Sequence, residues 1–248
     1  MDLIKYIYLT ILLITINNSM YAQKFTGEVV YKYRATDMFN IDSLKQFGKP
    51  GEAETLYNIN ESLKEYQDSF EFNLVFNKDS SNYFWKEILG SENNYASIDY
   101  AKIFTASDSK FYTSLKDSVS LEELGSFDKG MIIKRILNEI GWKLSNESKQ
   151  IGVYTCFKAT AIKVNPKKRI VVEAWYTPQI SNGFGPKYYA GLPGLILELT
   201  EGGITYYATS IKLNSKNEPK IKKPEKGKII THEQLLNKYK EIDKSRRN

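Results

Sequence analysis

The strongest constraint on the fold of this chain is a series of short segments in which apolar and polar side chains alternate, separated by tight turns. The clearest is Phe70–Phe76, in which aromatic or aliphatic residues occupy every second position. A period of two places successive side chains on opposite faces of a β-strand, so this segment predicts a half-buried strand. The turn Lys78–Ser80 then leads into a partner strand that carries Tyr83 and Trp85.

The same pattern recurs along most of the chain. We predict further strands at Gly27–Arg34, Lys102–Thr105, Phe111–Leu115, Met131–Leu137, Trp142–Ser145, Val153–Lys163, Ile170–Tyr176, Leu195–Leu199 and Ile204–Leu213. The alternation around Cys156 also predicts one continuous strand over Ile151–Ile162. Short strands joined by tight turns are typical of an antiparallel meander. A sheet of eight or more strands twists and tends to curl. The predicted fold is therefore mainly β, with a single antiparallel, strongly curved sheet that forms a half-barrel or a barrel-like body.

Helices are a minor part of this prediction, which includes one or two short ones. A helical face within residues 52–67 is formed by Leu56, Ile59, Leu63 and Tyr66. The pair Ser120 and Glu123 matches a capping box and predicts the start of a single helical turn.

The first 22 residues have the features of an export signal. Lys5 supplies positive charge, Tyr6–Ile16 is apolar, and Ala22 offers a small residue before Gln23. The apolar run is too short to span a bilayer, which needs about 20 residues. We expect a cleaved signal peptide (1–22), with an uncleaved anchor as the alternative, and an exported protein that is periplasmic or secreted and not integral to the membrane. A β domain (23–213) and a basic tail (214–248) follow.

The positive charge of the chain is concentrated in this tail. From Lys212 onward there are 12 Lys and Arg against 5 Asp and Glu, a net charge of +7, while the whole chain carries +6. Thr231 and Gln234 match a capping box, and Leu235, Tyr239 and Ile242 recur at helical spacing. We expect a short amphipathic helix that either rests on the domain or contacts an anionic surface or an envelope protein. Nucleic acid is not an expected partner, because an exported protein rarely meets it.

Cys156 is the only cysteine, which excludes an intramolecular disulfide. An exposed thiol is a liability in an oxidising compartment, so a buried position is expected. A redox or soft-metal role is the alternative.

A distinctive motif follows the block Ala174–Pro178. It consists of Gly191, Leu192, Pro193, Gly194, Leu195 and Ile196. Proline and glycine at successive positions suit the two central residues of a type II turn, in which Gly194 takes a positive φ. We therefore predict a rigid corner that begins a buried strand.

These residues resemble the GLPGLI family of exported proteins, found mainly in Bacteroidetes. The resemblance covers about residues 140–213, with a looser fit back to Phe25, and includes Trp142, Ile151–Thr160, Ala174–Pro178, Gly185 and Pro186. The family has no established activity, so the resemblance implies a compartment and assigns no catalytic residue.

Five aromatic residues near the motif are candidates for contact with a ligand or partner: Trp175, Tyr176, Phe184, Tyr188 and Tyr189. Trp175 and Tyr176 should point to opposite faces of their strand. The order of residues here is distantly similar to the closing strands of periplasmic lipoprotein carriers, which are open half-barrels. That similarity implies an apolar trough for an acyl chain with the helix near residues 52–67 as a lid. The alternative is that the aromatic residues fill a closed core.

Enzymatic chemistry has little support in the sequence. The single histidine, His232, lies in the tail, and the chain lacks a Gly-x-Ser-x-Gly elbow, a His-Glu-x-x-His pair and a phosphate-binding glycine loop. We expect no metal or cofactor. The favoured function is non-catalytic binding or carriage of an apolar or lipid-like ligand. The alternatives are an envelope interaction module with a closed core, or a hydrolase using carboxylates that are distant in sequence.

Overall fold

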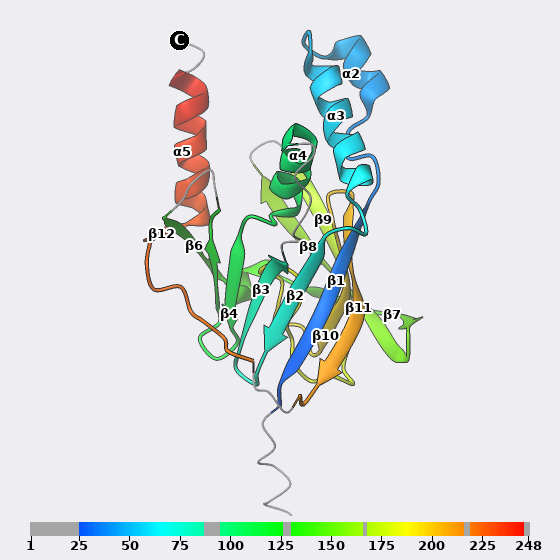
Figure 1. Ribbon diagram of the computed structural model, residues 1–248, viewed down its shortest axis with the longest axis vertical. Helices are drawn as coiled ribbons and strands as arrows, with labels where there is room; N and C mark the ends of the chain where they lie inside the picture. The colour runs from blue at the N-terminus through cyan, green and yellow to red at the C-terminus, as the bar shows by residue number, and fades with distance from the viewer. Residues whose placement is uncertain (1–24, 87–94, 126–129, 166–167, 216–218, 246–248) are drawn as a thin grey trace, which may run out of the picture.

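The computed structural model describes residues 25–86, 95–125, 130–165, 168–215 and 219–245. The predicted signal peptide (1–22) lies outside these ranges. The described chain forms one twelve-stranded sheet with helices at one end (Figure 1). No helix within the described ranges is long and apolar enough to cross a membrane.

The strands in chain order are β1 (Gly27–Ala35), β2 (Glu71–Phe76), β3 (Ser80–Lys86), β4 (Lys110–Ser114), β5 (Val119–Glu123), β6 (Met131–Ile136), β7 (Lys143–Ile151), β8 (Tyr154–Asn165), β9 (Lys168–Thr177), β10 (Leu195–Glu201), β11 (Ile204–Leu213) and β12 (Lys228–Thr231). Their order in the sheet is β12-β6-β5-β4-β3-β2-β1-β11-β10-β9-β8-β7. Every pair is antiparallel except β12 with β6, which is parallel. The predicted antiparallel sheet is therefore confirmed, with one parallel pair at an edge.

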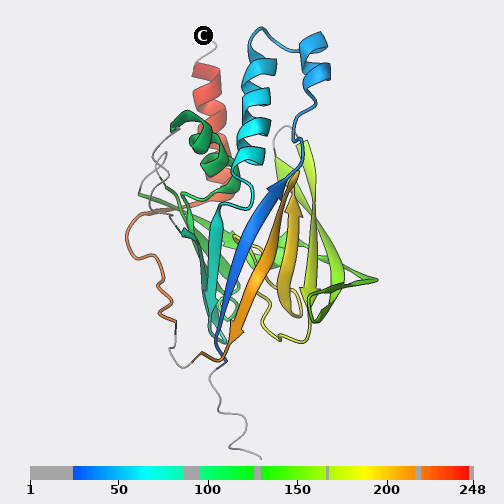
Figure 2. The same cartoon turned by 45° about the vertical axis from the view of Figure 1, so that its right-hand side comes forward.

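The sheet curls so that strands far apart in its order face one another (Figure 2). A 3₁₀-helix, η3 (Leu137–Ile140), follows β6 and lies against β8. Among the described residues no strand pairing closes the sheet between β12 and β7, so this part of the chain forms a curled open sheet. We call the line along which the β6–η3 segment faces β8 the seam.

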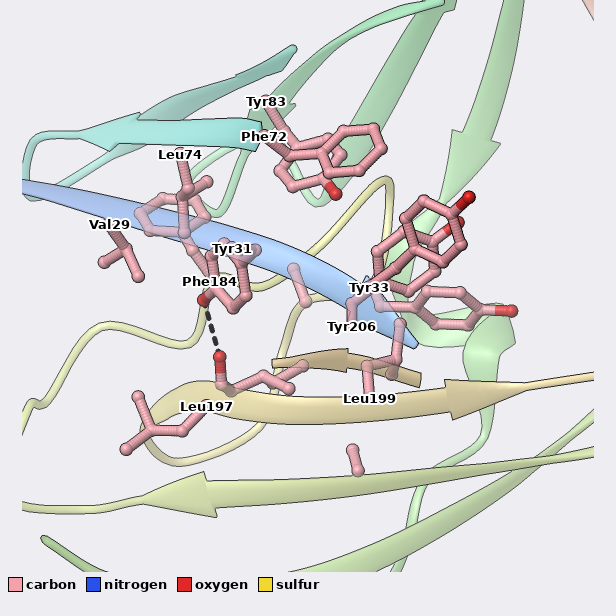
Figure 3. Packing of buried hydrophobic residues seen from close by; sticks show 14 of the residues in the cluster. Val29, Tyr31, Tyr33, Phe72, Leu74, Tyr83, Phe184, Leu197, Leu199 and Tyr206 are labelled. Carbon is pink, nitrogen blue, oxygen red and sulfur yellow. Dashed lines mark hydrogen bonds between the residues drawn. The ribbon is translucent and has the colours of Figure 1, made fainter. Parts of the chain in front are cut away.

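The main hydrophobic core lies on the concave side of this sheet (Figure 3). Tyr31 of β1 is fully buried, and its hydroxyl donates a 2.6 Å hydrogen bond across the core to the carbonyl of Ile196 in β10. Phe72 and Tyr83 stack with ring centroids 5.6 Å apart, which places aromatic rings from neighbouring strands in contact.

The helices are α2 (Ile41–Phe47), α3 (Glu52–Glu65), α4 (Tyr95–Thr105) and α5 (His232–Ser245). Two buried tyrosines of the sheet hold the ends of two of them. Tyr33 donates a 2.9 Å hydrogen bond to the carbonyl of Leu63 in α3, and Tyr206 donates a 3.0 Å bond to that of Thr105 in α4. These bonds satisfy carbonyl groups near helix C-termini that have no partner within the helix.

Two predicted helices are confirmed. The segment predicted within residues 52–67 is α3. The tail helix is α5, and its capping box forms as expected: the amide of Gln234 donates to Thr231 Oγ1 at 3.1 Å, and the amide of Thr231 donates to Gln234 Oε1 at 2.9 Å. The tail is also part of the sheet, because its residues Lys228–Thr231 form β12.

Three local predictions were wrong. Lys102–Thr105 is helical, the end of α4, because Ile98, Ala101 and Thr105 form a buried stripe at helical spacing. Ser120–Glu123 lies in β5 rather than at a helix start. Ile151–Ile162 is not one strand either, because Gly152, at φ +57°, turns the chain between β7 and β8. The described chain has four α-helices, where one or two in the β domain and one in the tail were expected.

Candidate functional site

The connection between β9 and β10, residues 178–194, folds into the concave side of the sheet. Its side chains Ile180, Phe184 and Tyr189 are at most 2% exposed. Its backbone is tied to β10, since the amide of Leu195 donates to Ile180 O at 3.0 Å and the amide of Ile196 donates to Phe184 O at 2.9 Å. We call residues 178–194 the plug, because they fill the hollow that a curled sheet would otherwise leave.

The plug ends in the Leu-Pro-Gly corner, which differs from the predicted type II turn. Gly194 has a φ of +159°, close to fully extended backbone. It is needed for a steric reason, because a Cβ at this position would lie 2.1 Å from the carbonyl oxygen of Thr177. The residue with a left-handed backbone is Gly191, at φ +88°, and the space around it is open. The motif therefore presses the plug against the end of β9.

The plug buries two of the predicted contact residues, which corrects the idea that they are displayed to a partner. Phe184 is fully buried and packs against Phe76 with ring centroids 5.8 Å apart. Tyr189 packs against Trp142 at 6.0 Å, and the indole of Trp142 donates a 2.9 Å bond to Ala190 O. Both are core residues.

Trp175 and Tyr176 lie on opposite faces of β9, as predicted. The Trp175 ring is on the outer face, where the ammonium groups of Lys149 and Lys158 lie 4.4 Å and 5.8 Å from its centroid. Tyr176 is on the concave face and packs against Phe157. Trp175 is 9% exposed and Tyr176 is 5% exposed, so neither offers much free surface. Cys156 is fully buried, as predicted, and burial raises the pKa of its thiol to about 11.

Two of the predicted residues, Tyr188 and the buried Tyr189, line an open site. The site is a cavity of about 170 Å³ at the seam, which we call the seam pocket. Its lining consists of Arg135, Ile136, Leu137, Glu139, Ile140, Ala161, Ile162, Lys163, Val164, Val172, Tyr188, Tyr189 and His232. These residues come from β6, η3, β8, β9, the plug and the first turn of α5. Most of the walls are aliphatic, and the basic groups are few.

Two cationic groups of the seam pocket lie beside the Tyr188 ring. The guanidinium carbon of Arg135 is 4.3 Å from the ring centroid, and the Lys163 ammonium is 5.9 Å from it. Arg135 Nη1 is 2.6 Å from Glu122 Oε2, although its N–H does not point along a good hydrogen-bond direction. Arginine has five N–H donors in a planar fork, so one carboxylate contact leaves donors for a ligand.

A buried ion network lies behind Lys163. The carboxylate of Glu201, whose side chain is 8% exposed, accepts hydrogen bonds from the ammonium groups of Lys163 and Lys187. The Lys187 contact is 3.1 Å, and the Lys187 side chain is 9% exposed. Burial alone raises the pKa of Glu201, but Lys187 and Lys163 outweigh it and lower this pKa to about 2. Burial lowers the pKa of Lys187, and Glu201 and Tyr206 reverse that effect and raise it.

Glu201 is therefore held as a carboxylate. A general acid needs a raised pKa, so this residue lacks the property that the acid of a glycosidase requires. Tyr188 and Tyr189 complete the polar side of the site through a 3.0 Å hydroxyl–hydroxyl bond and stacked rings 4.3 Å apart. The described residues contain no group of three or more His, Cys, Asp or Glu that could hold a metal ion.

His232 is the first residue of α5 and lines the seam pocket. Burial, together with the positive charges of Arg135 and Lys163, lowers the pKa of His232, and Glu122 opposes this only in part. The imidazole is therefore neutral at pH 7. Sequence reasoning placed this histidine in a peripheral tail, whereas the pairing of β12 with β6 brings it to the site.

Comparisons with known proteins identify a family of unknown function. The model described as "Protein of unknown function (Porph_ging)" matches residues 142–171 and 163–198, which is less than half of the chain. The match lies in the region that resembles the GLPGLI family and is consistent with that resemblance. It includes the plug, β8 and β9. No curated protein matches the chain.

Among solved structures, the chain is similar to PNGF-II in two crystal forms. The structure in space group P21 gives a TM-score of 0.50 at 17% identity, and the one in space group C2 gives 0.49 at 18% identity. The likeness covers 86% of this chain but only 33% and 32% of the two PNGF-II chains. This chain thus spans about a third of the length of PNGF-II. At such identity the likeness shows a fold and leaves activity open.

Proposed function

We propose that this chain is an exported, non-catalytic binding domain of the cell envelope, and that the seam pocket holds a small organic anion with a compact apolar body. The observation that carries the proposal is the convergence of Arg135 and Lys163, from strands far apart in the sheet order, on a cavity with aliphatic walls. Charge-assisted hydrogen bonds from such groups are among the stronger polar contacts a protein makes with a carboxylate.

The size of the pocket supports a compact ligand. An engineered cavity of about 150 Å³ is known to accept benzene, so a cavity of about 170 Å³ accommodates one ring or a short branched chain. The plug occupies the concave side, where an acyl chain was expected to lie. The ligand that fits is therefore apolar, as predicted, but it is a small organic acid and not a long acyl chain.

The placement of the charges also supports an anion at the Arg135 and Lys163 end of the pocket, while Glu139 is the one carboxylate of the lining. Glu122 and Glu201 lie behind the two cations and hold them in place, while His232 contributes no charge at pH 7. A bound carboxylate would compete with Glu122 for part of the Arg135 fork and would face the remaining donors of Lys163. We expect modest affinity, because the pocket is small and part of each cation is already paired.

The experiment is a titration followed by amide chemical shifts, with benzoate, cyclohexanecarboxylate, benzyl alcohol and benzylamine as probes. Benzoate and cyclohexanecarboxylate should bind with dissociation constants in the millimolar range or tighter. Arg135→Gln and Lys163→Gln should each weaken binding about tenfold, which corresponds to 1.4 kcal/mol. Lys149→Gln, on the outer face, is the matched control and should change nothing. Equal binding of benzyl alcohol and benzoate, or a long-chain fatty acid in the purified protein, would refute the proposal.

An envelope interaction module is a second candidate, because three apolar side chains are exposed on β8 and β9. Ile162 and Val171 form a cross-strand pair and are 47% and 61% exposed, and Val164 is 60% exposed. Exposed apolar patches often mark protein contacts. Val171→Lys should abolish capture of an envelope protein if this surface is the interface, while binding of benzoate stays unchanged.

Export is part of the proposal and has its own measurement. Intact mass of the protein recovered from its native compartment should match a chain that starts at Gln23. A mass that includes Met1–Ala22 would favour the uncleaved anchor.

A further inference from the structure

The tail carries a second feature on the outer face of the sheet. Residues 219–227, which we call the strap, run along the outside of the sheet from the end near β11 toward β12 (Figure 1). Asn82 of β3 holds the strap at its middle through two reciprocal bonds. The Lys222 amide donates to Asn82 Oδ1 at 2.7 Å, and Asn82 Nδ2 donates to the Lys222 carbonyl at 2.9 Å.

The end of the strap lies next to an apolar pair that is separate from the main core cluster. Leu121 of β5 and Ile132 of β6 are 4% and 2% exposed, although they are absent from the main core cluster. At its end the strap lies close to Ile132, since a Cβ at Gly227 would be 3.0 Å from Ile132 Cδ1. The next amide, that of Lys228, donates to Gly130 O at 2.8 Å. These contacts fix the path of the strap.

A groove of about 410 Å³ lies between the strap and the strands β3 and β4. Its lining consists of Asn82, Tyr83, Phe84, Lys110, Phe111, Tyr112, Glu123, Lys220, Lys222, Lys223 and Pro224. Volumes of about 300–1,000 Å³ are typical of small-molecule sites. We call this hollow the strap groove.

The strap groove combines aromatic and cationic groups. Phe84 and Tyr112 are half-buried, whereas their strand neighbours Tyr83 and Phe111 are buried in the core. Four exposed lysines line the groove, and none of them forms an ion pair with another described residue: Lys110, Lys220, Lys222 and Lys223. The single carboxylate of the lining is Glu123, opposite Lys110 in the sheet register. The groove therefore has excess positive charge above a partly exposed aromatic floor.

We infer that the strap groove binds an acidic oligosaccharide. The C–H faces of a sugar ring pack on aromatic rings, and carboxylate or sulfate groups of the same chain pair with unpaired lysines. A slender chain can enter a groove bounded by the strap, whereas a bilayer presents a wide surface that would meet the lysines but not the aromatic floor. The inference uses none of the residues of the seam pocket and is independent of the function proposed for it.

The test is calorimetric titration of the full mature chain with tetragalacturonate, with the neutral sugar cellotetraose, and with vesicles of phosphatidylglycerol in phosphatidylcholine. We expect tetragalacturonate to bind, cellotetraose to bind at least about tenfold more weakly, and the first affinity to fall with added salt. The double variant Lys220→Glu/Lys223→Glu should weaken tetragalacturonate binding about tenfold or more. Phe84→Ala should weaken it by a smaller factor.

The matched control is Lys45→Glu/Lys212→Glu, which makes the same change in net charge at exposed positions away from the groove. It should leave the affinity for tetragalacturonate unchanged. The lysine variants alter only exposed side chains, so they keep the test valid if Phe84→Ala does not fold. Equal losses in both double variants would show non-specific charge attraction and overturn the inference. Binding of vesicles without tetragalacturonate, or no binding at all, would also overturn it.

Discussion

Replacing Glu201 by glutamine tests whether the buried ion network holds the seam together. The Glu201 carboxylate joins Lys163 of β8 to Lys187 of the plug, and the Glu201 and Lys187 side chains are 8% and 9% exposed. Glutamine keeps the size and removes the charge, so the Lys187 ammonium loses its counter-charge in a site that water barely reaches. Breaking a buried pair in this way costs about 3–5 kcal/mol. We expect Glu201→Gln to lower the free energy of unfolding in urea by that amount.

Two further variants decide whether the unpaired charge is the cause. Lys187→Met in the Glu201→Gln background removes the stranded ammonium and should restore at least half of the lost stability. Glu147→Gln removes a carboxylate that is 62% exposed in its pair with Lys158, and should cost less than about 1 kcal/mol. If Glu201→Gln costs no more than Glu147→Gln, or if the double variant is as unstable as the sum of its single changes, the network does not stabilise the fold as argued.

Two other predictions concern the corner and acid stability. Gly194→Ala should lower the free energy of unfolding by about 3 kcal/mol, because its Cβ would collide with the Thr177 carbonyl, whereas Gly191→Ala should cost about 1 kcal/mol for its left-handed backbone alone. Equal costs would contradict the steric explanation. The pKa of His232 is lowered from 6.5 in the folded chain, so the unfolded chain takes up a proton first and stability should fall as pH drops below 7. The pKa of Glu201 is lowered from 4.5 to about 2, so a second loss of stability should follow between about pH 5 and pH 2. Urea unfolding across this pH range measures the free energy of unfolding. His232→Gln should flatten its decline below pH 7, and Glu201→Gln should flatten its decline between about pH 5 and pH 2. Profiles that the variants leave unchanged would contradict the assignments.

Local signals in the sequence predicted most of the sheet. Alternation in Phe70–Phe76 corresponds to β2 with its buried positions at every second residue. The capping box at Thr231 and Gln234 marked the start of α5 because its two hydrogen bonds are made within four residues. Such features are local, so the sequence contains all of the information that specifies them. The prediction for Lys102–Thr105 failed for the opposite reason. A four-residue segment with only two apolar residues, Ile103 and Phe104, fits a strand or a helix, and its packing decides between them.

The seam pocket had no local signal. Arg135, Lys163 and His232 lie on three separate elements, and no spacing between them in sequence has chemical meaning. They meet because β6 and β8 stand at positions two and eleven of the sheet order and the sheet curls. The pairing partner of β12 was equally hidden, since four residues of strand carry no information about which edge they join. Neither the seam pocket nor the pairing of β12 with β6 can be predicted without the order of the strands in the sheet.

The plug connects the motif in the sequence with the kind of ligand that the structure favours. A curled sheet with an aromatic concave face suggests a trough, and that prediction depends on the hollow staying open. Glycines let the plug pack closely on itself and on the sheet. A Cβ at Gly183 would lie 2.2 Å from the carbonyl oxygen of Leu192 within the plug, and one at Gly185 would lie 2.7 Å from Ile196 Cδ1 of β10. Phe184 then fills the hollow that an acyl chain would need. The glycine- and proline-rich segment therefore acts as core, and a small, partly charged cavity lies beside it at the seam.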